Sequence, residues 1–215
     1  MNFNESKTKQ NLAWAFAAEC QAGARYQFIA TQAQMSKMFY LKDTMKMLAK
    51  NEMAHAKLYY DYIIEKWGEE FKVEYDANYP YVCLDLQKSL VGEKNIERDE
   101  FERIYPKFAC IAREEGFVDI ANSFELVAKV ENTHSSILDF IAKRMAKNSL
   151  YSHKQKVLMK CSNCGHAEIL SEAWKKCPLC NLEQGYIELC YSDAIMEALQ
   201  KNNPAISKDC KSKKK

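Results

Sequence analysis

Residues that interrupt helices are scarce in this sequence. Its 215 residues include only six glycines and four prolines, whereas average usage would give about fifteen and eleven. Neither residue occurs in 24–67 or in 117–164. The scarcity of breakers favours long helices over a fold that is rich in turns.

A surplus of one charge sign and a long apolar run are also missing. The chain has 31 Lys and Arg against 29 Asp and Glu, a net charge of +2, which argues against a nucleic-acid-binding protein. The one basic run, at 208–215, is expected to be solvated. No uncharged apolar stretch approaches the roughly 18 residues of a membrane span, and the polar start at 1–5 is unlike a signal peptide. We therefore expect a cytoplasmic protein with no nucleic-acid or membrane partner.

Nine cysteines are present, but their spacing does not fit a disulfide framework. Four form two pairs, Cys161–Cys164 and Cys177–Cys180, which are separated by 12 residues. Two such pairs give four thiolates for one tetrahedral metal, and both zinc and iron accept this geometry. The odd total and the lack of a secretory signal indicate a reduced compartment. Five scattered residues are expected to be ordinary core or surface positions: Cys20, Cys83, Cys110, Cys190 and Cys210.

Helical periodicity dominates the first 148 residues. Four amphipathic segments are predicted there, at about 5–37, 40–67, 84–114 and 117–147. Gly68 and Gly116 are placed to end the second and third segments. The link from Glu69 to Cys83 is long for a helical bundle, and it predicts a crossover of the ferritin-like kind.

The predicted fold class is mainly α, with a small β module after the helices. Residues 1–148 are expected to form a ferritin-like four-helix bundle, and 149–160, polar and then strand-like, a linker. Residues 161–190 are too few for an independent apolar core, so a bound metal is expected to stabilise them. The extension at 191–215 includes a short predicted helix at 192–201.

Acidic and histidine side chains interrupt the apolar stripe of every predicted helix. In the fourth segment the stripe runs through Phe124, Val127, Glu131, His134 and Leu138. Bare burial of clustered carboxylates is not credible, because each is costly to desolvate and they repel one another. Two divalent cations would compensate the charge. The corresponding acids and imidazole on the other stripes are Glu19, Glu52, His55, Glu93, Glu97 and Glu100.

A specific recipe for a dinuclear centre fits these positions. A di-iron carboxylate bundle takes one Glu from each of two helices and Glu-x-x-His from the other two. The matching residues are Glu19, Glu52 with His55, Glu97, and Glu131 with His134. Mixed carboxylate and imidazole donors favour iron or manganese. The chain has only four histidines, and two of them occupy this motif, so coincidence explains the pattern poorly. Glu93, one turn before Glu97, is expected to be solvated at the bundle end.

The same residues resemble the rubrerythrin family over about 7–189. The motifs that carry the resemblance are Glu52-x-x-His55, Glu97-x-x-Glu100, Tyr105-Pro106, Glu131-x-x-His134, Cys161-x-x-Cys164-Gly165 and Cys177-Pro178-Leu179-Cys180. The sequence departs from the family pattern at Ile96, where a glycine is usual, and in the loop 171–174, which lacks the usual glycine and proline. These departures leave every candidate ligand in place.

The resemblance implies a di-iron bundle followed by a rubredoxin-like domain. It assigns seven ligands to the two irons: Glu19, Glu52, His55, Glu97, Glu100, Glu131 and His134. It implies that one iron exchanges Glu100 for His55 on reduction, and it places Tyr26 and Tyr105 close to the irons as catalytic tyrosines. It gives Cys161, Cys164, Cys177 and Cys180 a third iron; beside a redox-active bundle we expect iron there, with zinc as the other candidate.

The resemblance further implies a non-haem iron peroxidase. The expected reaction is reduction of hydrogen peroxide to water in defence against oxidative stress, with electrons from an external reductase. It also implies a head-to-tail homodimer. Two other functions fit the residues: a ferritin-like ferroxidase or iron-storage protein, and a non-enzymatic bundle with a structural zinc ribbon that binds a partner.

Overall fold

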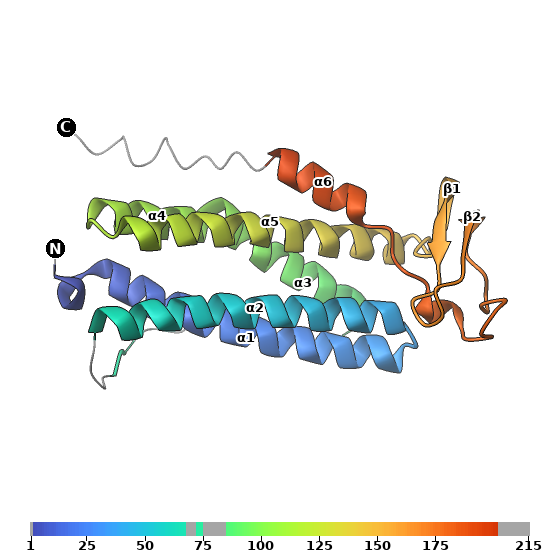
Figure 1. Ribbon diagram of the computed structural model, residues 1–215, viewed down its shortest axis with the longest axis horizontal. Helices are drawn as coiled ribbons and strands as arrows, with labels where there is room; N and C mark the ends of the chain where they lie inside the picture. Colours follow the sequence, from blue (N-terminus) through green and yellow to red (C-terminus); the bar gives the residue numbers. More distant parts are fainter. Residues whose placement is uncertain (1, 68–71, 75–84, 202–215) are drawn as a thin grey trace.

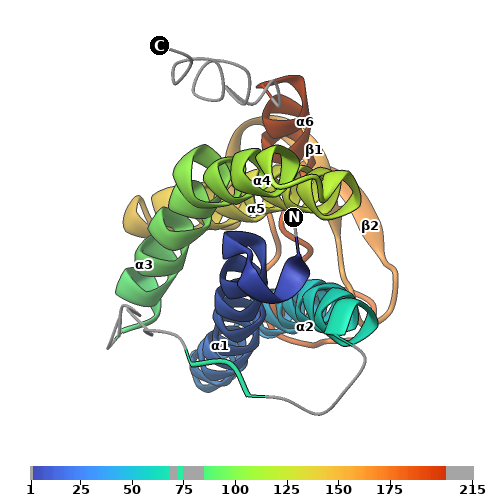
Figure 2. The same ribbon diagram turned by 90° about the vertical axis from the view of Figure 1, so that its left-hand side faces the viewer.

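The computed structural model describes residues 2–67, 72–74 and 85–201, which form a helical bundle with a small β module at one end (Figure 1). Two long antiparallel helices, α1 and α2, lie side by side and form one layer. Helices α3, α4 and α5 form a second layer that faces this pair (Figure 2). The helices are α1 (Lys7–Met35), α2 (Phe39–Trp67), α3 (Leu86–Asp99), α4 (Tyr105–Glu114), α5 (Val118–Ala146) and α6 (Ser192–Lys201), with 3-10 turns at Phe3–Glu5 and Gln184–Tyr186.

The four predicted helical segments are confirmed, with one local difference in the third. Between α3 and α4 the backbone forms a π-helical turn, Glu100–Ile104, so 84–114 is one helical path with a wider turn in its middle. Pro106 lies two residues after the end of this turn and has no N–H to donate to it. Wider turns of this kind often occur at functional sites, and this one includes Glu100, a candidate ligand.

Hydrogen bonds to side chains cap the start of α1, and a glycine ends α4. Glu115 accepts hydrogen bonds from the backbone N–H groups of Lys7 and Thr8 at 2.9 Å each, and Ser6 Oγ accepts from the N–H of Lys9 at 3.1 Å. Three of the four unpaired N–H groups at the start of α1 are therefore satisfied. Gly116 ends α4 at a φ of +91°, a backbone conformation that suits glycine, as predicted.

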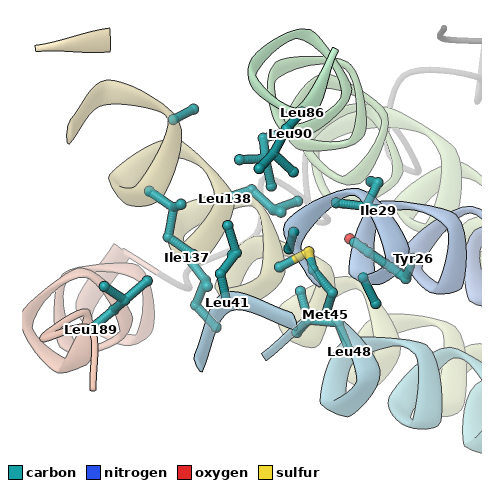
Figure 3. Packing of buried hydrophobic residues seen from close by; sticks show 14 of the residues in the cluster. Tyr26, Ile29, Leu41, Met45, Leu48, Leu86, Leu90, Ile137, Leu138 and Leu189 are labelled. Atoms are coloured by element: carbon teal, nitrogen blue, oxygen red, sulfur yellow. The ribbon is translucent and has the colours of Figure 1, made fainter. Parts of the chain in front are cut away.

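Two apolar clusters fill the bundle on either side of its acidic middle. One cluster lies toward the β module and includes Met45 and Leu48 of α2, Leu138 of α5 and Tyr26 of α1 (Figure 3). The other lies toward the opposite end and is rich in aromatic rings, among them Tyr59, Tyr105 and Phe124. The helices therefore have apolar contacts on both sides of the candidate ligands, and this packing fixes the helix segments that carry the acids.

The β module is built on an antiparallel pair, β1 (Ser152–Lys160) and β2 (Ala167–Glu172). Strand β1 occupies the strand-like part of the predicted linker, because its N–H and C=O groups find partners in β2. The module packs against the turn between α1 and α2. There Phe39 stacks on Tyr186 at 4.4 Å between ring centroids, and a Cβ on Gly185 would lie 1.8 Å from the Lys37 carbonyl oxygen.

Several other predictions fall in or beside the described residues. The short helix at 192–201 is confirmed as α6, which packs on α5. Gly68, the basic tail, Cys83, Cys210 and most of the predicted crossover lie outside the described residues. Cys20 and Cys190 are free thiols, but Cys110 is disulfide-bonded, so its interpretation as an ordinary residue was wrong. Across the described residues, no helix has the length and apolar character needed to span a membrane.

Candidate metal centres

Six side chains from four helices meet between the two apolar clusters. They are Glu19 of α1, Glu52 and His55 of α2, Glu97 of α3, and Glu131 and His134 of α5. Their donor atoms form two groups, and within each group the atoms lie within 4.8 Å of one another. The first group is Glu19, Glu52, His55 and Glu131; the second is Glu52, Glu97, Glu131 and His134. Because Glu52 and Glu131 belong to both, the geometry fits two ions joined by shared carboxylates.

Both imidazoles direct the same ring nitrogen into the cluster. His134 Nδ1 lies 2.8 Å from Glu52 Oε1 and 2.9 Å from Glu131 Oε2. His55 Nδ1 lies 3.1 Å from Glu131 Oε1 and 3.3 Å from Glu19 Oε2. In each Glu-x-x-His motif the spacing of three residues places both donors on one helix face. The periodicity of the sequence therefore produces the convergence that it predicted.

Burial, repulsion between carboxylates and attraction between carboxylates and imidazoles together set the pKa values in the cluster. Burial raises the pKa of Glu19 and of Glu97 well above the usual carboxyl value, and neighbouring carboxylates add to the shift. Burial acts in the same sense on Glu52, but the charge and hydrogen bonds of His134 outweigh it and lower the pKa of Glu52. Burial would lower the pKa of His134, yet the charges of Glu52 and Glu131 raise it well above its usual value.

Buried polar atoms without a hydrogen-bond partner indicate which kind of ligand the cluster can bind. Among the described residues, buried atoms without a hydrogen-bond partner include Glu52 Oε1, Glu97 Oε2, both Glu131 carboxylate oxygens and His134 Nδ1. These atoms approach one another closely but are not aligned for hydrogen bonding, and leaving such groups unpaired is costly. Carboxylate oxygens and imidazole nitrogens that converge in this way are the donors that iron and manganese accept. The residues present therefore fit a pair of divalent cations.

Two buried tyrosines donate hydrogen bonds to Glu97 and Glu19, the two carboxylates that belong to only one donor group each. The Tyr26 hydroxyl donates to Glu97 Oε1, and the Tyr105 hydroxyl donates to Glu19 Oε1. Burial and the nearby carboxylates raise the pKa of both hydroxyls well above the usual tyrosine value, so they stay protonated and act as donors. The family resemblance implied that both tyrosines lie near the site, and the structure places both in direct contact with candidate ligands.

Asn51 is a contact of the site that the sequence analysis missed. Its side-chain amide nitrogen lies 3.3 Å from His134 Nε2, on the side of the ring that faces away from the carboxylates. A metal-binding imidazole commonly has such an outer partner, which fixes the ring and its tautomer. No signal in the sequence identifies this role, since Asn51 is one of several polar residues on α2.

Two acids of the third segment lie differently from the rest. Glu100 is buried beside the cluster, but it belongs to neither group of four donors. Glu93 was expected to be solvated, and this was wrong. Its side chain is 2% exposed and pairs with Arg25, with Arg25 Nε 2.8 Å from Glu93 Oε1. A charged partner on α1 compensates this burial, and the position of Glu93 on the stripe of Glu97 was the signal for it.

The four paired cysteines form the second candidate metal centre, the four-cysteine site. Cys161 Sγ lies 3.8 Å from Cys180 Sγ, and Cys164 Sγ lies 3.6 Å from Cys177 Sγ. All four sulfurs lie within 4.8 Å of one another, which fits one tetrahedral ion. His166 is not in this group; its ring lies 4.9 Å from that of Trp174 between centroids, tilted by 39°, and remains partly exposed.

The two cysteine turns direct backbone N–H groups at the sulfurs. A hydrogen bond from the Leu182 backbone lowers the pKa of Cys180 to about 7, and one from the Cys180 backbone lowers the pKa of Cys177. Backbone donors of this kind favour thiolates, the form that binds metal. Four thiolate sulfurs bind either zinc or iron, so the geometry of the two turns does not identify the metal.

Comparisons with known proteins cover the bundle and most of the chain. The family model described as Rubrerythrin matches residues 10–142. The rubrerythrin of Clostridium perfringens is 35% identical over 185 residues, which span 86% of this chain and 94% of that protein. The rubrerythrin of Porphyromonas gingivalis is 31% identical over 184 residues, spanning 85% and 90%.

Solved structures show the same fold. Nigerythrin in its fully reduced, all-ferrous state superposes with a TM-score of 0.57 at 24% identity, and the match covers 88% of this chain and 93% of that one. A likeness at that identity supports a ferritin-like bundle with a rubredoxin-like module and nothing finer. Together with the family match across the bundle and a relative that is 35% identical over nearly its whole length, it leads to one conclusion: the chain belongs to the rubrerythrin family.

Proposed function

We propose that this protein reduces hydrogen peroxide to water at a di-iron centre in the bundle, in defence against oxidative stress. The observation that carries the proposal is the pair of four-donor groups that share Glu52 and Glu131, in one chain with the four-cysteine site. The proposed ligands are Glu19, Glu52, His55, Glu97, Glu100, Glu131 and His134. The cluster of Cys161, Cys164, Cys177 and Cys180 is proposed to hold the iron that passes electrons inward.

Reduction of hydrogen peroxide consumes two electrons and two protons and gives two waters. Two ferrous ions held by the bundle would supply both electrons at once, and iron in the four-cysteine site, fed by an external reductase, would restore them singly. The protein contributes a dry site, because no donor side chain in the two groups is more than 13% exposed. The most exposed donor is His55, so we propose that peroxide enters on its side.

Tyr26 and Tyr105 supply the proposed proton chemistry. Each hydroxyl holds its proton at neutral pH and donates it in a hydrogen bond to a carboxylate, Glu97 or Glu19. These bonds orient the two carboxylates, and they place a proton at the tyrosine oxygen within one hydrogen bond of the donor atoms. We propose that a proton lost from either tyrosine is replaced from solvent, the source of the two protons that the reaction consumes.

The test is anaerobic reduction of the iron-loaded protein, followed by addition of peroxide and observation of the iron–thiolate absorption. We expect two irons in the bundle and one in the four-cysteine site. Reduction should bleach the iron–thiolate absorption, and the absorption should return as added peroxide is consumed. Slow peroxide consumption with growth of an iron core would instead identify a ferroxidase. A colourless protein from iron-replete cells would indicate a structural zinc ribbon.

Substitution of the most loosely placed proposed ligand tests its role. Glu100→Ala is expected to leave the helices intact, because Glu100 lies in the π-helical turn and outside both donor groups. It is expected to slow peroxide turnover about 10–1,000-fold, the range seen when a group that acts only during reaction is removed. Stopped-flow kinetics give the rate, and circular dichroism checks the fold; an unchanged rate removes Glu100 from the reaction.

We further propose a head-to-tail homodimer in the cytoplasm. The basis is the family, whose members pair so that the cysteine iron of one chain approaches the bundle of the other. Within one chain the β module packs at the end of the bundle, beyond the apolar cluster that separates it from the acids (Figure 1). Sedimentation at micromolar concentration tests the assembly, and a monomer would contradict it.

A further inference from the structure

Both tyrosines at the bundle site donate to a carboxylate, but their surroundings differ. Tyr26 donates to Glu97 and belongs to the apolar cluster toward the β module. Within the described part of the chain, no aromatic ring packs against it. Tyr105 donates to Glu19 and belongs to the opposite cluster, which is rich in aromatic rings. The two hydroxyl contacts are alike, so the difference lies in what surrounds each ring.

A series of three rings leads from Tyr105 toward the surface. The Phe108 ring of α4 lies 6.2 Å from that of Tyr105 between centroids, at an interplanar angle of 64°. The Trp14 ring of α1 lies 5.5 Å from that of Phe108, edge to face at 83°. Tyr105 is fully buried, whereas Trp14 is partly exposed. The series therefore joins a hydroxyl that contacts a candidate ligand to a ring that water reaches.

Packing alone explains this series poorly. The cluster around Tyr26 fills its end of the bundle mainly with buried aliphatic side chains, so a ring at each position of the series is not needed to close a core. Its first and last members are tyrosine and tryptophan, the aromatic side chains that lose one electron most readily, and Phe108 lies between them. Tyr59 also lies 6.0 Å from Tyr105, but it is fully buried, so an electron vacancy placed there would stay inside the protein.

The stoichiometry of the proposed reaction gives such a series a use. Peroxide takes two electrons at once, whereas a single iron in the four-cysteine site returns them one at a time. The bundle centre must therefore pass through a half-reduced state, in which it holds one electron. Peroxide that arrives in this state needs a second electron from the protein itself, and an oxidised side chain left beside the site would go on to react there.

We propose that Tyr105 gives this second electron, and that Phe108 and Trp14 lead the resulting vacancy to the surface. One electron comes from the remaining ferrous ion and one from Tyr105, whose hydroxyl proton passes to Glu19 along the existing hydrogen bond. That proton and one from solvent complete two waters as the O–O bond breaks. An electron from Trp14 then restores Tyr105, which regains a proton from solvent, and the indole loses its N–H proton to water. A small thiol in solution returns a hydrogen atom to Trp14 and ends as a disulfide.

The inference rests on the proposed function, because it needs iron in the donor groups and peroxide as the oxidant. The experiment uses protein with iron in the bundle and zinc in the four-cysteine site, since zinc has no electron to give. The bundle is reduced anaerobically by one electron per centre, mixed with hydrogen peroxide and frozen at once. Electron paramagnetic resonance counts the half-reduced centres, which have an odd number of electrons, and detects a side-chain radical. Tryptophan deuterated in its ring narrows the radical signal only if the radical is on the indole.

We expect a tryptophan radical in the wild-type protein and its loss in three variants. Trp14→Phe removes the outer ring and Phe108→Leu the middle one, so in both the radical should stay on tyrosine. Tyr105→Phe keeps the ring but removes the hydroxyl, and the tryptophan radical should not form. Trp67→Phe is the matched control, because Trp67 is also partly exposed and lies in the same cluster, but packs on Phe3. It should keep the wild-type signal.

A second measurement needs no variant. Wild-type protein is cycled with peroxide in the absence of thiol, and its peptides are then analysed by mass spectrometry. Trp14 should be the first of the three tryptophans to be oxidised, ahead of Trp67 and Trp174, and only when the bundle holds iron. Added thiol should suppress this oxidation, because it returns a hydrogen atom to the indole.

The outcomes separate this inference from the proposed function. Half-reduced protein that consumes peroxide without forming a tryptophan radical overturns the inference and leaves the proposed function intact. An unchanged indole signal in Trp14→Phe, or oxidation of Trp67 or Trp174 ahead of Trp14, does the same. Fully reduced protein that leaves peroxide unconsumed overturns both.

Discussion

The two candidate metal centres are assembled in opposite ways. The bundle donors come from four helices and are positioned by apolar clusters on either side, so packing brings them together. The cysteines lie between 161 and 180, in two turns, beside a core of only three buried apolar side chains: Met159, Ala173 and Ile187. Helix packing can therefore bring the bundle donors together without metal, whereas the small core of the β module predicts that its two cysteine turns need a bound ion.

Removal of the metal from the four-cysteine site should have the largest effect. Binding of a structural ion is worth about 10–16 kcal/mol in small thiolate domains and is coupled to folding. Cys177→Ser is therefore expected to unfold β1 and β2 while α5 keeps its structure. Hydrogen exchange read by mass spectrometry would show loss of protection in 152–172 only. Cys190→Ser, which changes a free thiol outside the cluster, serves as the control. Protected strands in the Cys177 variant would contradict the contrast.

Loss of a candidate ligand in the bundle should stabilise the metal-free protein, because buried, mutually repelling carboxylates lower its stability when no metal is bound. Glu97→Gln removes a buried carboxylate that neighbouring acids repel, and the amide oxygen can still accept from Tyr26. We expect metal affinity to fall more than about 100-fold and the metal-free protein to gain about 1 kcal/mol, as at other functional sites. Metal titration and urea unfolding measure the two effects. Glu102→Gln, on an exposed turn nearby, should change neither.

Local periodicity explains how much of the fold and site was predictable. Glu52, His55, Glu131 and His134 repeat at helical spacing, so their common face follows from the sequence, and the cysteine turns are equally local. The pairing of Arg25 with Glu93 joins residues 68 positions apart on different helices. No pattern within either helix specifies this pairing; only the burial of Glu93 had a signal, its position on the stripe of Glu97.

The π-helical turn and the outer contacts were unpredictable for a related reason. Pro106 marks a disturbance of the helix, but whether the preceding turn widens depends on the packing of α3 and α4 against α5. Asn51 reaches His134 because α2 and α5 lie at one particular rotation. Such contacts depend on the relative placement of whole helices, which a stripe of apolar residues fixes only coarsely.

Removal of the hydrogen-bond partner of His134, Asn51, should have an intermediate effect on metal affinity. When Nδ1 binds metal, Nε2 carries the proton, so Asn51 must present its amide oxygen as acceptor, a half-turn of the side-chain amide. Asn51→Leu removes that acceptor and should weaken metal binding about 10–100-fold. Asn51→Asp keeps an acceptor oxygen and should retain affinity. Equal losses in both variants, measured by competition with a chelator, would show that size and not hydrogen bonding matters.

The smallest effect on stability is expected at the cap of α1, which belongs to neither candidate metal centre. Glu115 accepts from the N–H groups of Lys7 and Thr8 and from the Thr8 hydroxyl, at 2.6 Å for the last. Glu115→Gln keeps an acceptor but loses the charge that favours a helix N-terminus, and should lower the free energy of unfolding by about 1 kcal/mol. Glu114→Gln, its exposed neighbour on the same helix, is the control.

The pH dependence of that cap has a definite sign. Burial opposes ionisation of Glu115, but the hydrogen bonds from Thr8 and Lys7 outweigh it and lower its pKa in the folded protein. The folded state therefore binds a proton less readily than the unfolded chain, whose carboxyl pKa is about 4.3. The stabilisation is complete above that value and is lost as pH falls through the folded pKa. Urea unfolding of wild type and E115Q should thus differ at pH 7 and converge in acid. The titration of the candidate ligands is common to both proteins and cancels in the difference, so a gap that stays constant on acidification would show that the cap acts through shape and not charge.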